Sequence, residues 1–183
     1  MQDFFSSHPL MVFGFHGCKA SVASRVINGL DQLRPSDNRY DWLGSGIYFW
    51  ENAPARALEW ASARFGPEAA VVGAVIQLGS CLNLMDKACN MELRQAYEFL
   101  AASGAMMPSN HGKAHDLDKL VIQTAAQFHR LQNGRDFDTV RGAFVEGEPI
   151  YPDASIMADT HIQLCVRNPA AIVACFLPRT IPA

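Results

Sequence analysis

The order of the strand-like and helix-like segments is what most constrains the fold of this chain. Short apolar runs rich in β-branched residues, typical of strands, occur at 10–15, 46–50, 70–78, 139–145, 161–167 and 171–177. Segments with apolar residues at helical spacing lie between them, at 21–30, 54–65, 93–102 and 117–131. Because the regular alternation of a doubly wound fold is missing, this order predicts an α+β domain with a mixed or antiparallel sheet.

The helix predicted at 54–65 has the clearest ends. Asn52 is of a type that caps helix N-termini, and Pro54 suits the first turn, where the missing N–H costs nothing. Gly66 and Pro67 then interrupt the helical pattern. We therefore expect a helix capped by Asn52 that ends at Phe65.

Length and charge limit the class of protein. The chain has 183 residues, 49% of them hydrophobic and 18% charged, with a net charge of -3. We expect one globular domain over 1–183, and neither a disordered nor a polybasic nucleic-acid-binding chain. No apolar stretch reaches the roughly 18 residues that span a bilayer, and Met1 to Phe4 lack the basic start of a signal peptide. We expect a soluble cytoplasmic protein that does not enter membranes.

The cysteines indicate reduced thiols. There are five, and none forms a CxxC pair, so disulfides and zinc are disfavoured. Cys18 could act as a nucleophile with His16 only if the strand stays extended beyond Gly17, and a small buried residue is the preferred interpretation. His111 and His115 are spaced to share a helix face, but no third ligand is evident. We predict no metal site.

Several common catalytic motifs are absent from the sequence. Gly44-Ser45-Gly46 precedes a predicted strand, whereas a dinucleotide fingerprint follows one and opens a helix. The sequence also has no GxxxxGK[ST] phosphate loop, no HExxH and no GxSxG. The corresponding nucleotidase, metalloprotease and hydrolase classes are therefore not indicated.

Two short segments each combine a polar ring with glycine in an apolar run. The first is Phe-Gly-Phe-His-Gly-Cys at 13–18, with His16 beside Gly17. The second is Leu-Gly-Ser-Gly-Ile-Tyr-Phe-Trp at 43–50, with Tyr48 close to Gly46. Because glycine lets a ligand approach the backbone, the segments predict a ligand site at His16 and Tyr48.

These segments resemble the first two motifs of the ADP-ribosyltransferases of the diphtheria-toxin and poly(ADP-ribose) polymerase class. That pattern runs His-Gly, helix, loop, Gly-x-Gly-Ile-Tyr-Phe, and this chain has His16-Gly17, a predicted helix, a loop and then 44–49 in the same order. A third motif of the class lies on a late strand, and His-Ile-Gln-Leu-Cys-Val-Arg-Asn-Pro at 161–169 occupies that place. The resemblance spans nearly the whole chain.

The resemblance implies a fold of two facing, mostly antiparallel sheets with NAD in the cleft between them. His16 would bind a hydroxyl of the adenosine ribose, and the Gly17 backbone would pair with the nicotinamide amide. Tyr48 would stack on the nicotinamide ring. Gly46 and Arg141 are further candidates for NAD contact, although Arg141 could instead be an ordinary ion-pair partner of Asp136 or Asp138.

The chain departs from the family pattern at two positions. The family often places a second aromatic residue where this chain has Glu59, and Trp60 is the neighbour that could replace it. The third motif carries a glutamate in polymerase-like members, but this chain has Gln163, a neutral amide that can bind a ribose hydroxyl without opposing positive charge. Glu146 could supply the missing carboxylate. Transfer of a single ADP-ribose is therefore expected, not chain building.

The resemblance also suggests the biological role. Compact members of the class look like bacterial toxins, including those of toxin–antitoxin and phage-defence systems, so an antitoxin protein is an expected partner. The acceptor would be RNA or protein. Cationic and aromatic residues that could contact RNA are Arg34, Arg39, Arg64, Arg135, Arg141, Trp42 and Trp50. Two other functions stay open, an NAD glycohydrolase and a catalytically silent module that binds NAD or ADP-ribose.

Overall fold

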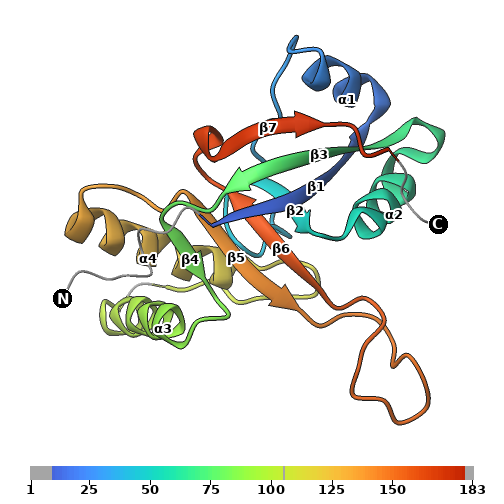
Figure 1. Cartoon of the computed structure of the whole chain (residues 1–183). Helices are drawn as coiled ribbons and strands as arrows, with labels where there is room; N and C mark the ends of the chain where they lie inside the picture. The colour runs from blue at the N-terminus through green and yellow to red at the C-terminus, as the bar shows by residue number, and fades with distance from the viewer. Residues whose placement is uncertain (1–9, 105, 180–183) are drawn as a thin grey trace.

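The structure, a computed structural model, describes residues 10–104 and 106–179. Over these residues, seven strands form one sheet in the order β4-β5-β6-β2-β1-β3-β7, accompanied by four α-helices. Neighbouring strands are antiparallel except β4 and β5, which are parallel. The predicted α+β class with a mixed sheet is confirmed (Figure 1).

The prediction about a signal peptide concerns Met1 to Phe4, which lie outside the described residues.

The predicted elements all occur; the helix at 54–65 has the predicted bounds, and the other elements have shifted ends. The strands are β1 (Met11–Lys19), β2 (Ile47–Glu51), β3 (Ala69–Gln77), β4 (Cys81–Asn83), β5 (Thr139–Phe144), β6 (His161–Val166) and β7 (Ile172–Phe176). The helices are α1 (Ala20–Ile27), α2 (Pro54–Phe65), α3 (Lys87–Ala102) and α4 (Asp116–Asn133), with 3-10 turns η1 (Gly66–Glu68) and η2 (Pro169–Ala171). The sequence reasoning missed β4, which is too short for a periodic pattern, and began α3 too late.

Helices α1 and α2 lie on opposite faces of the β1–β3 part of the sheet. Ala23 and Val26 of α1 pack in a core cluster with Val72, whereas Ala57 of α2 packs with Val71. Adjacent residues of a strand point to opposite faces, so the two helices cover the two faces. Figure 1 shows both helices beside this part of the sheet.

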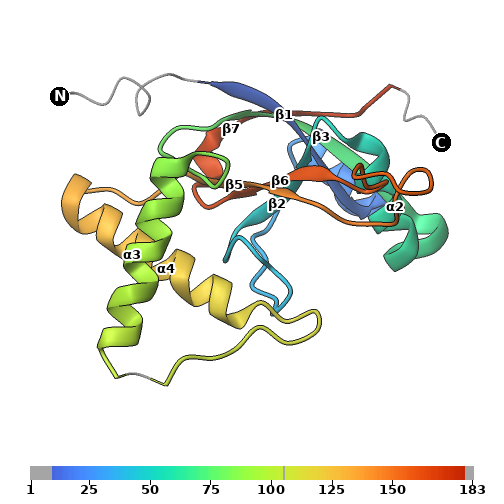
Figure 2. The ribbon, with the colours of Figure 1, turned by 90° about the horizontal axis from the view of Figure 1, so that it is seen from below.

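Helices α3 and α4 cover the other half of the molecule. Ile122 and Ala126 of α4 pack against Val140 of β5 and Cys165 of β6. Figure 2 shows α3 and α4 together on one side of the sheet, next to β5. The core is therefore divided into several clusters, one of which lies between α3 and α4.

The sheet is narrowly joined in its middle. The family resemblance implied two facing sheets, whereas the described strands form one continuous ladder. However, β1 and β2 share only two paired positions, Gly14 with Glu51 and Phe15 with Trp50. Beyond Phe15 the strands separate, and the His16 ring bridges the gap by donating a 2.8 Å hydrogen bond from Nδ1 to the Tyr48 carbonyl. The two halves of the sheet, β4-β5-β6-β2 and β1-β3-β7, are thus joined over a short stretch and separate beyond it.

The predicted cap of α2 is wrong. Asn52 has a φ of 52°, in the left-handed region, and the cap position is Ala53, which makes no side-chain hydrogen bond. Asparagine is one of the few residues that tolerate this conformation, and here Asn52 turns the chain sharply from β2 into α2. Its N–H donates to the Phe13 carbonyl at 2.9 Å. The predicted end at Gly66 is confirmed, with a φ of 54°.

Of the helices in the described parts of the chain, none combines the length and the apolar composition that crossing a bilayer requires.

Candidate functional site

A cavity of about 710 Å³ opens where β1 and β2 separate. This volume is within the roughly 300–1,000 Å³ of small-molecule sites. Six of the eight residues predicted for NAD binding or catalysis line it, from β1, β2, α2, the loop after β5, and β6. They are His16, Gly17, Tyr48, Trp60, Glu146 and Gln163. Residues far apart in the chain therefore meet at one cavity.

His16 is held as a neutral hydrogen-bond acceptor. Burial lowers its pKa, and the bond to the Tyr48 carbonyl opposes that shift only in part. Because a carbonyl oxygen only accepts, Nδ1 must carry the proton, which leaves Nε2 with its lone pair. His16 can therefore accept a hydrogen bond from a ligand hydroxyl.

Gly17 offers its backbone to the cavity. Phe13 accepts from Asn52 on the β2 side, and Leu10 accepts from Leu78 on the β3 side. Backbone groups alternate along a strand, so those of Gly17 point toward the β2 side, beyond the last β1–β2 pair. They are placed to pair with a planar amide.

Because Gly17 has no side chain, α2 can pack close to β1. A Cβ at this position would lie 2.5 Å from the Ala57 carbonyl oxygen and 3.1 Å from Trp60 Cε3. Cβ atoms do not approach other atoms at 2.5 Å, so only glycine lets α2 come this close. Trp60 is brought to the cavity by the same approach.

The Tyr48 hydroxyl is committed to the chain itself. It donates to the Gly44 carbonyl at 2.7 Å and accepts from the Leu43 N–H at 2.9 Å. Burial raises its pKa far above the ordinary value for tyrosine. Tyr48 therefore cannot serve as a general acid or base near neutral pH, and its ring is the part that a ligand can use.

Trp60, and not Glu59, faces the cavity. Its ring centroid is 5.8 Å from that of Trp50, and the Arg64 guanidinium lies 5.4 Å above it. Glu59 is exposed and pairs with Arg56 at 2.5 Å. Because neighbouring helix positions point about 100° apart, only one of the two could face inward.

The loop between α1 and β2 is held by Asp41, which sequence reasoning missed. Asp41 is buried and accepts hydrogen bonds from Ser36 Oγ at 2.9 Å and from the Asn38 N–H at 2.6 Å. The loop places Arg34 and Asn38 in the cavity lining. The sequence carries no clear signal for this contact, because Asp41 binds groups three and five residues before it, whereas the common aspartate turns bind the backbone two residues after the aspartate.

Arg56 was also missed, although it joins two walls of the cavity. Its guanidinium pairs with Glu146 at 3.5 Å and with Asp159 at 3.6 Å, at the two ends of the long loop between β5 and β6. That loop extends away from the sheet in Figure 1. Arg56 precedes Trp60 by four residues, so helical spacing alone placed both on one face of α2. Glu146 lines the cavity but is not an unpaired carboxylate.

Gln163 lines the cavity because the pairing of β6 with β2 places it beside Trp50. It is paired with Trp50 of β2, and its amide nitrogen is 3.1 Å from Nε2 of His161. The His161 side chain is 1% exposed. The Gln163 amide therefore has a buried ring as its neighbour.

Two of the predicted NAD contacts do not line the cavity. Arg141 makes a bidentate pair with Glu51, at 2.5 and 2.6 Å, and not with Asp136 or Asp138. Its neighbour Gly142 is the residue opposite Gln163, so Arg141 points to the other face of the sheet.

Gly46 acts in packing between strands. A Cβ there would lie 2.5 Å from the sulfur of Cys165 and 2.6 Å from the Val166 carbonyl oxygen. The glycine therefore permits close contact between β2 and β6, and is not among the residues that line the cavity.

Of the cysteine and histidine candidates for other chemistry, Cys18 and His111 do not line the cavity, whereas His115 does. Cys18 is in the core, as predicted, and burial raises its thiol pKa to about 11. The His115 ring packs on Trp42 at 4.0 Å, whereas the His111 backbone bridges to Ala114. In residues 10–104 and 106–179, no group of three or more His, Cys, Asp or Glu side chains could hold a metal ion.

The arginines predicted to contact RNA do not lie together. Arg34 and Arg64 line the main cavity, together with Lys113. Arg39 is occupied by Asp116, and Arg135 lies at a second cavity. Spacing in sequence could not reveal these separate locations, because the arginines come from different elements.

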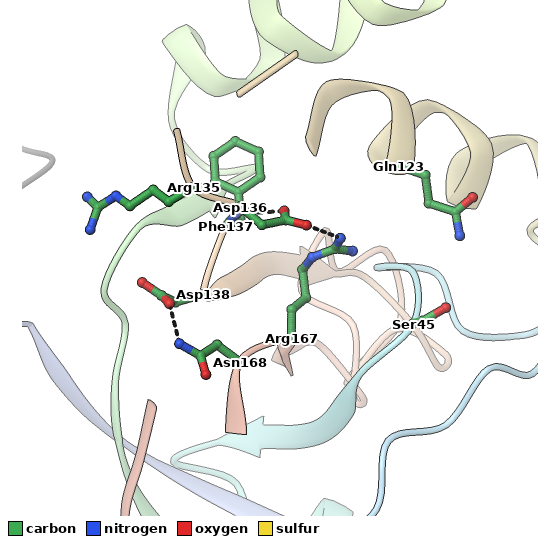
Figure 3. Close-up of a pocket in the computed structure, with 8 residues that line it drawn as sticks. All are labelled: Ser45, Gln123, Arg135, Asp136, Phe137, Asp138, Arg167 and Asn168. Carbon is green, nitrogen blue, oxygen red and sulfur yellow. Dashed lines mark hydrogen bonds and ion pairs between the residues drawn. The ribbon is translucent and has the colours of Figure 1, made fainter. Parts of the chain in front are cut away.

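The second cavity, of about 430 Å³, is lined mainly by polar residues that pair with one another (Figure 3). Arg167 contacts Asp136 at 3.2 Å, and Asn168 donates to Asp138 at 2.7 Å. Arg135 points away from this group. The charges are largely compensated within the cavity, so it does not favour a ligand of either sign.

No protein-family model, curated protein or solved structure matches the chain.

Proposed function

We propose that the main cavity binds NAD and that the chain is a mono-ADP-ribosyltransferase. The observation that carries the proposal is the convergence of His16, Gly17, Tyr48, Trp60 and Gln163 on one cavity. The family resemblance assigned these residues to NAD, or to the aromatic face beside it, from sequence order alone.

The strand arrangement supports the same proposal. The family fold holds NAD between two sheets, and here the ladder narrows to two residue pairs between β1 and β2. The cavity lies at that opening. We infer that this sheet corresponds to the split sheet of the family.

The contacts available in the cavity suit the parts of NAD. Neutral His16 would accept from a hydroxyl of the adenosine ribose, and the inward backbone of Gly17 would pair with the carboxamide. The rings of Tyr48 and Trp60 supply aromatic faces for the cationic nicotinamide ring. Arg34 and Lys113 supply positive charge for the diphosphate.

The proposed reaction breaks the bond between ribose C1 and the nicotinamide nitrogen. The bonding electrons leave with nicotinamide, which becomes neutral, and positive charge develops on the ribose. An acceptor nucleophile then bonds to C1 and loses its proton. Glu146 is the carboxylate on the cavity wall that could take this proton, and its partner Arg56 would hold it in place.

One observation favours a silent binding module instead. The amide at the third motif is neutral, and the candidate carboxylate predicted from the sequence, Glu146, is already paired with Arg56 at 3.5 Å. Such a site would bind NAD without cleaving it. An NAD glycohydrolase is the other alternative, in which water replaces the acceptor.

The test measures NAD binding by calorimetry and nicotinamide release by chromatography. The wild-type chain should do both, and His16→Ala and Tyr48→Ala should lose most of the release. Arg25→Ala, an exposed change on α1, is the matched control and should leave both unchanged. Binding without release over hours would favour the silent module, and unchanged release in the two cavity variants contradicts the proposal.

The acceptor class needs a separate experiment. NAD labelled in its adenylate part is incubated with the chain and a whole bacterial lysate, and the product is divided between nuclease and protease. Release of the label by one treatment identifies RNA or protein as the acceptor, and free ADP-ribose alone identifies the glycohydrolase. A macromolecular product would support a cytoplasmic toxin or defence effector, with a neutralising antitoxin protein as its partner.

A further inference from the structure

We propose that His161 is a positioning residue that holds the Gln163 carboxamide with its oxygen toward the cavity. The proposal rests on the proposed function for the use of that oxygen, but its geometry stands independently. The two residues lie on the same face of β6, two positions apart.

The tautomer of His161 follows from its backbone partner. Nδ1 lies 2.6 Å from the carbonyl oxygen of Asp159, which can only accept, so Nδ1 carries a proton. In the neutral ring, Nε2 is then an acceptor. The buried ring is fixed between Trp50 and Phe144, with centroids 6.5 and 6.0 Å away.

This tautomer distinguishes the two orientations of the Gln163 amide. With its nitrogen toward His161, the amide donates to Nε2 across 3.1 Å. With the amide reversed, its oxygen would face the lone pair of Nε2, and the two would repel. The two orientations have almost the same shape, so hydrogen bonding, and not packing, selects between them.

In this orientation, Gln163 Oε1 is a hydrogen-bond acceptor at the cavity. Gln163 Oε1 has no donor among the described residues, and Gln163 lines the cavity. A glutamine fixed in this way presents one oxygen to a ligand hydroxyl, as a carboxylate would, but without charge. This is how a neutral residue could replace the glutamate of the third motif in orienting ribose.

The charges near His161 include both signs. Glu146 Oε2 is 4.0 Å from Nδ1, too far for a hydrogen bond, and its closer contact is with Arg56 at 3.5 Å. The Asp159 carboxylate also pairs with Arg56, at 3.6 Å. Both carboxylates near His161 therefore have Arg56 as an ion-pair partner.

The first test is spectroscopic and does not require activity. Long-range proton–nitrogen correlation spectra at neutral pH should show His161 protonated at Nδ1 alone. The Gln163 amide signal, assigned by its loss in Gln163→Ala, should shift in His161→Phe and be largely restored in His161→Gln, whose amide oxygen can accept in place of Nε2. A proton on Nε2, or an unshifted amide in His161→Phe, overturns the proposal.

The second test is a double-mutant cycle on nicotinamide release. His161→Phe should lower kcat about tenfold, the size expected for one hydrogen bond, with little change in KM, and should have no further effect in Gln163→Ala. Additive losses would overturn the proposal. If the wild-type chain does not consume NAD, the proposed function fails, and the spectroscopic test still decides whether His161 orients the amide.

Discussion

Removing Arg141 should destabilise the fold strongly, because its ion pair with Glu51 is largely buried. The pair with Glu51 is bidentate, and the two side chains are only 15% and 6% exposed. The bond with Glu51 raises the arginine pKa. Arg141→Met would leave the Glu51 carboxylate buried without a partner, which typically costs about 3–5 kcal/mol.

That loss corresponds to a large thermal shift. For a domain of this size, each kcal/mol lowers Tm by about 2–4 °C, so Arg141→Met should lower it by roughly 6–20 °C in calorimetry. The matched control is Arg39→Met. Arg39 also makes a bidentate pair, with Asp116, but its side chain is 76% exposed, and its removal should change Tm by a small fraction of that amount.

A double replacement separates the pair from packing. Glu51→Met combined with Arg141→Met removes both charges, so most of the lost stability should return. If Arg141→Met lowers Tm no more than Arg39→Met, the pair is not desolvated and the reasoning is refuted. If the double variant is as unstable as the single one, packing and not charge explains the loss.

Three further predictions concern the cavity walls. Gly17→Ala should lower stability by about 1–3 kcal/mol through overpacking against α2, whereas Gly142→Ala, whose Cβ would meet nothing closer than 3.4 Å, should have little effect in the same denaturation assay. Because the pKa of His16 is lowered from 6.5, the unfolded chain binds more protons below that pH, so unfolding free energy should fall as the pH drops below about 6.5. His16→Gln should flatten that slope without abolishing it, since burial also lowers the pKa of His129; an unchanged slope contradicts the assignment. Tyr48→Phe keeps the ring but loses two hydrogen bonds, so Tm should fall while calorimetric NAD affinity changes little.

Local patterns in the sequence predicted most of the fold, because each strand and helix carries its own periodicity. The β1 and β2 segments were found because glycine and apolar residues mark them, and α2 because Pro54 and Gly66 mark its ends. Strand order, by contrast, depends on contacts between distant segments. The parallel pairing of β4 with β5 and the narrow β1–β2 junction could not be obtained from periodicity.

The candidate site was predictable where a residue lies inside a motif. His16, Gly17 and Tyr48 met this condition, and all three line the cavity. Arg141 did not follow, because a shift of one position along a strand moves a side chain to the opposite face. Gly46 did not follow because it packs closely against Cys165 and Val166 of β6. Residues that act through partners far away in the chain, such as Arg56 and His161, need the fold to be recognised.

Helix α2 connects the stability of the core with the composition of the cavity. Ala57 and Ala61 are fully buried, and both would lie close to a Cβ at Gly17. Arg56 and Trp60, one position before each of these alanines, line the cavity instead. The two faces belong to one rigid helix, so a change in how α2 packs on β1 moves both the aromatic face and the arginine that holds Glu146. Gly17 therefore contributes to the cavity in two ways. Its backbone faces the cavity, and its lack of a side chain allows the packing of α2 that places Arg56 and Trp60 there.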